Sequence, residues 1–172
     1  APTEISPLSR HDALPIYVGA VRLLSGQAGW VAGPHLNIYT PRTLAMLADL
    51  GATRWVAPVE VTRELLAGVL AERPAGVEAE LFAYGRLPLA FSARCFTARR
   101  FNLQKEKCEY SCLDFPDGML LSTREGQPFL VINGVQTQSA RVYNLVGEIA
   151  SIRATGVDIV RISPQSSGTV EV

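Results

Sequence analysis

Hydrophobic and polar positions along the chain follow two patterns in turn, one typical of short buried strands and one typical of helices. The predicted strands cover Trp30–Gly33, Arg54–Pro58, Val77–Tyr84 and Val157–Ile162. The predicted helices run from Thr40 to Leu50, from Thr62 to Ala71 and from Arg141 to Thr155. Thr40 and Pro41 suit a helix cap and first turn, which strengthens the first of these helices.

The stretch between the third strand and the last helix departs from this alternation. Gly85 is expected to end the third strand. A polar, irregular segment follows from Ala98 to Asp117, and then Leu120–Ser122 and Phe129–Ile132 are expected to pair as a local hairpin.

Strands that alternate with helices are typical of a parallel sheet. The sequence therefore predicts an α/β fold, and within it a partial (β/α) barrel of the TIM-like kind. A complete barrel takes about 250 residues, whereas roughly five strands can be identified here, so we expect a fragment that lacks the first strands and the C-terminal end. An open doubly wound sheet is the alternative, but no glycine-rich phosphate loop opens a helix.

The N-terminal residues do not resemble the rest of the chain. The string His11-Asp12-Ala13-Leu14-Pro15-Ile16 resembles the translation of a sequencing adapter. We therefore expect residues 1–16 to be a non-native segment, and we exclude His11 and Asp12 from any site. Residues 17–172 are expected to form the partial barrel domain, with a cysteine-bearing insertion around residues 95–118.

Composition and charge narrow the class of protein. Hydrophobic residues make up 48% of the chain, and the formal net charge is zero. A neutral chain is not a typical nucleic-acid binder, so we expect no nucleic-acid partner. No apolar run could span a bilayer, and no stretch resembles a secretory signal. Together with an odd number of cysteines, this favours a cytoplasmic location.

The cysteines are the candidate chemistry. The chain has three, Cys95, Cys108 and Cys112, spaced Cys-x12-Cys-x3-Cys. Thiolates so closely grouped indicate a zinc or iron–sulfur site, and the spacing does not distinguish the two. The alternative is three buried structural cysteines, which the polar neighbours disfavour. Structural zinc and four-iron clusters normally take four protein ligands, so one ligand is missing from this set.

Two motifs resemble the collagenase-like peptidase family: Glu80-Leu-Phe-Ala-Tyr-Gly85, followed by Ser92-Ala-Arg-Cys95. Further segments resemble the subgroup of that family that serves oxygen-independent ubiquinone biosynthesis. They are Ala32–Asn37, Pro58–Thr62, Ser92–Arg99, Val131–Thr137, Val142–Leu145 and Val160–Gln165. The sequence departs from most relatives at Leu87-Pro88-Leu89, where they have a cysteine.

The resemblance implies a [4Fe-4S] cluster held by Cys95, Cys108 and Cys112, with a fourth cysteine ligand that lies upstream in the family and is absent here. It implies an iron–sulfur protein required for ring hydroxylation without O2, working as a heterodimer with a paralogue of the same family. A ubiquinone precursor and prephenate are the implied small-molecule substrates. The alternatives within the family are a collagenase-like peptidase and a prephenate-dependent RNA hydroxylation protein.

Two further residues are candidates for catalysis, His35 and Glu60, because both follow predicted strands, where (β/α) folds carry their chemistry. The alternatives are a hydrogen-bonded core histidine and a carboxylate beside the positive end of the helix that Thr62 opens. A peptidase would need Cys95 as nucleophile and His35 as its base. Arg94 and Arg99, which flank Cys95, could place positive charge beside an anionic cluster.

Overall fold

A computed structural model describes residues 18–27, 29–104, 107–167 and 169 of the chain. It divides into two compact units, and each is described by itself. The first unit comprises Ala1–Phe82 and Glu148–Arg161, and the second comprises Ala83–Gly147 and Ile162–Val172. The predicted boundary of the adapter-like segment at residue 16 lies outside the described residues.

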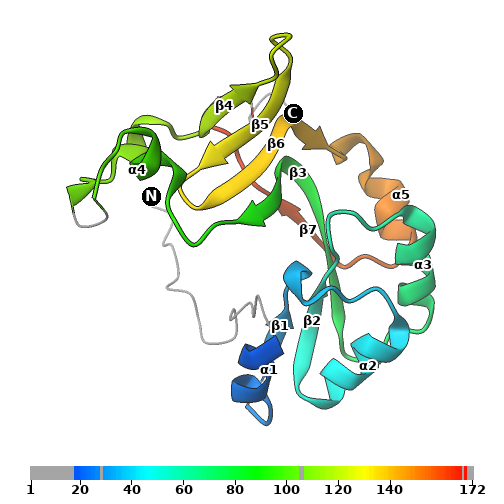
Figure 1. The fold of residues 1–172 in the computed structure, drawn as a ribbon. Coiled ribbons are helices and arrows are strands. Elements are labelled where there is room, and N and C mark those ends of the chain that lie inside the picture. Colours follow the sequence, from blue (N-terminus) through cyan, green and yellow to red (C-terminus); the bar gives the residue numbers. More distant parts are fainter. Residues whose placement is uncertain (1–17, 28, 105–106, 168, 170–172) are drawn as a thin grey trace, which may run out of the picture. The chain divides into compact units, whose positions relative to one another are not determined.

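The first unit is built from alternating strands and helices (Figure 1). In chain order its elements are α1 (Val18–Leu24), β1 (Trp30–Ala32), the 3-10 turn η2 (Pro34–Leu36), α2 (Pro41–Asp49), β2 (Ala52–Val56), α3 (Arg63–Ala71), the beginning of β3 (Glu78–Phe91), α5 (Ile149–Ala154) and most of β7 (Ile159–Ile162). The structure confirms, within two residues, the predicted strands at 30–33 and 157–162 and the first two predicted helices. The second predicted strand is also present, but it begins and ends two residues earlier than expected.

All strands of the first unit run parallel. β1 pairs with β2 and β2 pairs with β3, both in parallel register. β7 pairs with β3. The Asp158 N–H donates to the Ala79 carbonyl and the Ser163 N–H donates to the Tyr84 carbonyl, so the bonds advance in the same direction along both segments, as in a parallel pair. The β1–α2–β2–α3–β3 order is that of successive βα units, which sequence periodicity had indicated.

Helix caps and a closely packed core explain why these elements form. The Thr40 side chain accepts a hydrogen bond from the Thr43 N–H, and the Thr62 side chain does the same for Leu65 N–H, so both helices begin at a satisfied cap. Trp30 and Trp55 are almost completely buried. Helix α2 packs against β2 and α3, which covers one face of the parallel strands.

The second unit is built around antiparallel strands. It contains the rest of β3, the short helix α4 (Phe96–Arg100), the 3-10 turn η4 (Ser111–Asp114), β4 (Met119–Ser122), β5 (Pro128–Asn133), β6 (Gln136–Asn144) and the first part of the 3-10 turn η5 (Val146–Glu148). β3 pairs with β6, β6 with β5, and β5 with β4. The predicted local hairpin is confirmed as β4 and β5.

Gly85 does not end the third strand, so that prediction is wrong. β3 continues to Phe91 because β6 supplies a partner for its second half: Gly85 pairs with Tyr143 and Arg86 with Val142. Gly85 has a φ of 124°, which glycine adopts without strain. Pro88 stands where the register shifts on both sides, so its missing N–H interrupts no regular ladder.

The helix predicted from Arg141 to Thr155 is also wrong in its first half. Residues 136–144 form β6, and only Ile149–Ala154 is helical. Val142 and Tyr143 favour a strand, and pairing with β3 satisfies their backbone groups. The Asn144 side chain then accepts a hydrogen bond from the Val146 N–H, which starts the turn that precedes α5.

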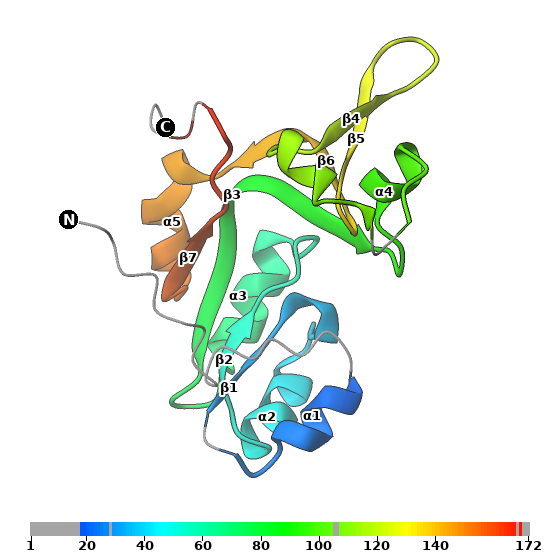
Figure 2. The same cartoon turned by 90° about the vertical axis from the view of Figure 1, so that its left-hand side faces the viewer.

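The strands form a seven-stranded mixed sheet in the order β1-β2-β3-β6-β5-β4, with β7 on β3, and this sheet does not close on itself (Figure 2). The chain is therefore mixed α/β, and closure into a TIM-like barrel stays a prediction. Among the described residues, no helix has both the length and the hydropathy needed to cross a membrane.

Candidate functional site

The loops that follow β1 and β2 meet at one edge of the first unit. Because the two strands are parallel, their carboxyl ends share an edge, and the Tyr39 hydroxyl donates a 2.8 Å hydrogen bond to Glu60 Oε1. His35 lies in η2, half-buried, and Asn37 ends that turn in the left-handed region with a φ of 55°. This edge therefore joins a phenol to a carboxylate, with an imidazole in the same loop as the phenol.

Electrostatics at this edge centre on Tyr39. Burial, followed by the hydrogen bond and charge of Glu60, raises the pKa of Tyr39 above its ordinary value. Tyr39 thus stays a neutral hydrogen-bond donor at physiological pH, and it fixes the orientation of the exposed Glu60 carboxylate. Sequence reasoning named Glu60 and His35 but missed Tyr39, because nothing in a single sequence pairs residues 21 positions apart.

A second polar group lies within the sheet of the first unit. Glu80, on β3, is only 4% exposed, and it forms ion pairs with Arg54 on β2 and Arg161 on β7. Arg54 also binds Glu78 at 2.9 Å. A buried carboxylate is costly unless it is paired, so two guanidinium groups from neighbouring strands explain how Glu80 is tolerated.

The three cysteines all lie in the second unit, and all are free and half-buried. Cys95 caps α4, Cys112 lies within η4, and Cys108 precedes that turn. Each cysteine carbonyl accepts a hydrogen bond from a residue three or four positions later: Arg99 N–H at Cys95, Ser111 N–H at Cys108 and Phe115 N–H at Cys112. The backbone thus turns sharply at each thiol.

Aromatic stacking joins the elements that carry the cysteines. α4 packs against η4, and the ring of Phe101, at the end of α4, stacks on that of Phe115, at the end of η4, with centroids 5.8 Å apart. Between Cys108 and Cys112, Glu109 and Tyr110 both have positive φ, at 48° and 55°. Such conformations are costly for these residue types, and they occur often at functional sites.

The turn after the cysteines is fastened at two points. At Gly118, with a φ of 78°, an added Cβ would lie 2.5 Å from Val131 Cγ1, so only glycine fits there. Asp117 accepts hydrogen bonds from the Ser166 hydroxyl and, at 2.8 Å, from the Ser166 N–H. These two bonds hold the pKa of the Asp117 carboxyl below its usual range.

The positions of the described side chains bear on the predicted metal site. Within the described ranges, no three His, Cys, Asp or Glu side chains lie together in a way that could hold a metal ion. The thiols are the right donors for iron or zinc, and the short elements beside them, α4 and η4, are in contact. His35 and Cys95, the pair that a cysteine peptidase would need, belong to different units.

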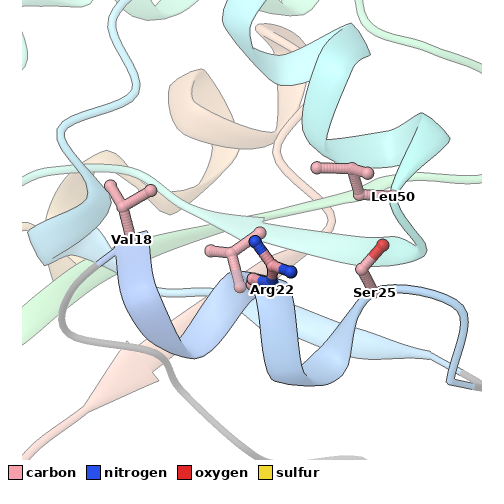
Figure 3. A pocket seen from close by; sticks show the side chains of 5 residues that line it. Val18, Arg22, Ser25 and Leu50 are labelled. Carbon is pink, nitrogen blue, oxygen red and sulfur yellow. The ribbon is translucent and has the colours of Figure 1, made fainter.

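A pocket in the first unit lies between α1 and the end of α2. It is lined by Val18, Val21, Arg22, Ser25 and Leu50 (Figure 3). Among the described residues that line this pocket, Arg22 carries the one ionisable side chain.

The chain matches the model of a known protein family. The model of Peptidase family U32 matches residues 31–172, which include elements of both units from β1 onward. No solved structure matches the chain.

Proposed function

Because this chain belongs to peptidase family U32, we propose that it is a UbiV-like iron–sulfur protein of that family, required for oxygen-independent ubiquinone biosynthesis. In this proposal Cys95, Cys108 and Cys112 supply three ligands of a [4Fe-4S] cluster. The chain works as a heterodimer with a UbiU-like paralogue, and the pair supports hydroxylation of a ubiquinone precursor with prephenate as the oxygen donor.

The observation that carries the proposal is that all three thiols lie in or beside one pair of contacting elements. Cys95 immediately precedes α4 and Cys112 lies within η4, which packs against α4, while Cys108 lies four residues before Cys112. Free thiols on sharply turned backbone are what a thiolate-bound cluster requires, and such a cluster would supply one-electron transfer. Within the described residues the thiols do not form a metal-binding group, so the proposal rests on their donor chemistry and on the contact between α4 and η4.

Visible absorbance of protein purified and reconstituted without oxygen tests the cluster. We expect the sulfur-to-iron charge-transfer band to weaken strongly in each of Cys95→Ser, Cys108→Ser and Cys112→Ser. Ser122→Ala, an exposed position on β4, is the matched control and should keep the band. A colourless protein that binds zinc instead, or a band that survives all three substitutions, would contradict the proposal.

Glu60 tests whether the edge of the first unit takes part in the reaction. If the Tyr39–Glu60 pair contacts substrate, Glu60→Ala should abolish ubiquinone formation while leaving the cluster band intact. Retained ubiquinone formation would remove Glu60 from the reaction. Tyr39→Phe, which deletes only the hydroxyl, should give an intermediate loss.

The peptidase alternative is supported by the family's name alone. It requires Cys95 to act as a nucleophile with His35 as its base. Peptide hydrolysis that persists in iron-free protein and disappears in both Cys95→Ala and His35→Ala would favour it over the iron–sulfur proposal.

A further inference from the structure

One of the two arginines that pair with Glu80 has hydrogen-bond donors that the ion pair does not use. Arg161 uses its Nε–H to bind Glu80 Oε1. Within the described part of the chain, neither Nη atom of Arg161 has a hydrogen-bond partner. Arg54 differs, because its Nε and both Nη atoms are all engaged with Glu78 and Glu80.

Burial of Glu80 makes Arg161 a rigid group. Glu80 is 4% exposed and is held on its other oxygen by Arg54 at 3.5 Å, so it cannot move freely. A guanidinium fixed at Nε is planar and presents its two Nη groups as a preset fork. Such a fork matches the two oxygens of a carboxylate, and less of its rotamer entropy is lost on binding.

The position of Arg161 suits a ligand. It is the penultimate residue of β7, which runs parallel to β3, and its side chain is 40% exposed. In α/β folds, ligands bind at the carboxyl ends of parallel strands. The partners that hold Arg161 are inside the sheet, while its free face remains accessible.

The carboxylates of the network do not occupy the Nη groups of Arg161. Two guanidinium groups face two carboxylates, so the formal charge is balanced. Glu78, which is 52% exposed, binds Arg54. Glu80 binds the Nε side of Arg161, so among the described residues neither carboxylate binds an Nη group of Arg161.

We propose that Arg161, oriented by Glu80, binds the carboxylate group of a small organic acid. Glu80 is a positioning residue here, and Arg161 makes the contact. This inference deepens the proposed function, because prephenate is itself an organic acid with carboxylate groups. Its test does not require the cluster, because the cysteines belong to the other unit.

Nuclear magnetic resonance of the iron-free chain at low salt tests this directly. Succinate is the probe, and the backbone amide signals of Ile162 and Ser163, next to Arg161, are the reporters. We expect saturable shifts with succinate and none with succinamide, which has the same shape without the charge. Inorganic phosphate, a tetrahedral anion, should bind more weakly than succinate, and equal binding would overturn the carboxylate assignment.

Two charge-conserving variants distinguish bidentate binding by the Arg161 guanidinium from nonspecific electrostatic attraction. Arg161→Lys keeps the positive charge but loses the planar fork, and we expect about tenfold weaker binding. Glu80→Asp keeps the negative charge but shortens the side chain, which moves the carboxylate away from Arg161 Nε. Succinate binding should therefore also weaken. Arg63→Lys, an exposed arginine of α3 that pairs with Glu148, is the matched control and should bind succinate normally.

The outcomes that overturn the proposal are specific. They are the absence of saturable succinate shifts, or equal affinity in wild type and Arg161→Lys. Should Glu80→Asp disturb the whole amide spectrum, Arg161→Lys decides alone, since its side chain is partly exposed. Because no iron is present, failure here leaves the iron–sulfur proposal intact, and failure of the cluster test leaves this one intact.

Discussion

At the scale of single residues, the two tryptophans of the first unit offer a matched comparison. Trp30 and Trp55 are 1% and 0% exposed, on neighbouring strands. The Trp30 indole N–H donates to the Leu50 carbonyl at 3.2 Å, whereas the Trp55 indole N–H is buried with no partner in the described part of the chain. The first therefore gains a hydrogen bond on folding and the second does not.

We predict that Trp30→Phe lowers the free energy of unfolding by about 1 kcal/mol more than Trp55→Phe does, since only Trp30→Phe removes an indole hydrogen bond. Both changes remove a similar volume from the core. Urea denaturation of the two variants beside wild type measures the difference. Equal losses would mean that the Trp30–Leu50 bond contributes nothing net.

Asp158 makes the stability of the first unit depend on pH. It accepts a 2.8 Å hydrogen bond from the Ala79 N–H and pairs with Arg73, and these contacts hold the pKa of the Asp158 carboxyl below its usual range. A depressed pKa stabilises the fold above the ordinary carboxyl range, and this contribution is lost as the pH falls through the folded-state value.

Asp158→Asn should therefore be less stable than wild type at pH 7, by under about 1 kcal/mol because the pair is partly exposed. The gap should be smaller at pH 3 than at pH 7, because the contribution of the wild-type carboxylate is lost as the pH falls. Urea denaturation at both pH values measures it. A gap that stays constant or widens in acid would contradict the assignment.

At the scale of elements, the Phe101–Phe115 stack joins the two short pieces that carry Cys95 and Cys112. α4 and η4 are five and four residues long, too short to be stable alone, so they depend on this contact and on β5. The arrangement of the thiols thus depends on one pair of rings.

We predict that Phe115→Ala loosens this pair and that the cysteines react faster with a disulfide reagent, since their thiols become more accessible. The rate of thiol modification at fixed pH measures this. Phe129→Ala, a 60% exposed phenylalanine of β5 in the same unit, is the control and should leave the rate unchanged. An unaltered rate in Phe115→Ala would show that the stack does not shield the thiols.

Elements with strong local signals could be predicted from the sequence, and elements set by distant pairing could not. α2 and α3 carry threonine caps and apolar positions at helical spacing, and they appear where expected. The sequence predicts a helix from Arg141, whereas residues 141–144 end β6. Their strand character depends on pairing with β3, more than fifty residues earlier. Gly85 was read as a break for the same reason.

At the scale of the whole molecule, the thiol count limits the cluster. The chain has three cysteines, one fewer than a [4Fe-4S] cluster normally takes from protein. We predict that the reconstituted chain binds fewer than four irons. Iron analysis against protein concentration measures this, and four irons per chain would contradict it.

Single residues with the right chemistry could be predicted, but their partners could not. Cys95, Cys108, Cys112, His35 and Glu60 were identified from type and spacing, and the roles assigned to them stay predictions. Tyr39 and Arg161 were missed, since each acquires its role from a partner that only folding brings near: Glu60 for the first and Glu80 for the second.

The second half of β3 and the return of the chain into α5 have one further consequence. Leu145 N–H donates to the Ala83 carbonyl at 2.7 Å, so the stretch between these two residues begins and ends at points joined by a hydrogen bond. A segment whose two ends adjoin can be exchanged as a cassette, because a short connector replaces it without stretching the host. Evolution could therefore have fitted different cysteine-bearing modules, or none, onto one βα scaffold.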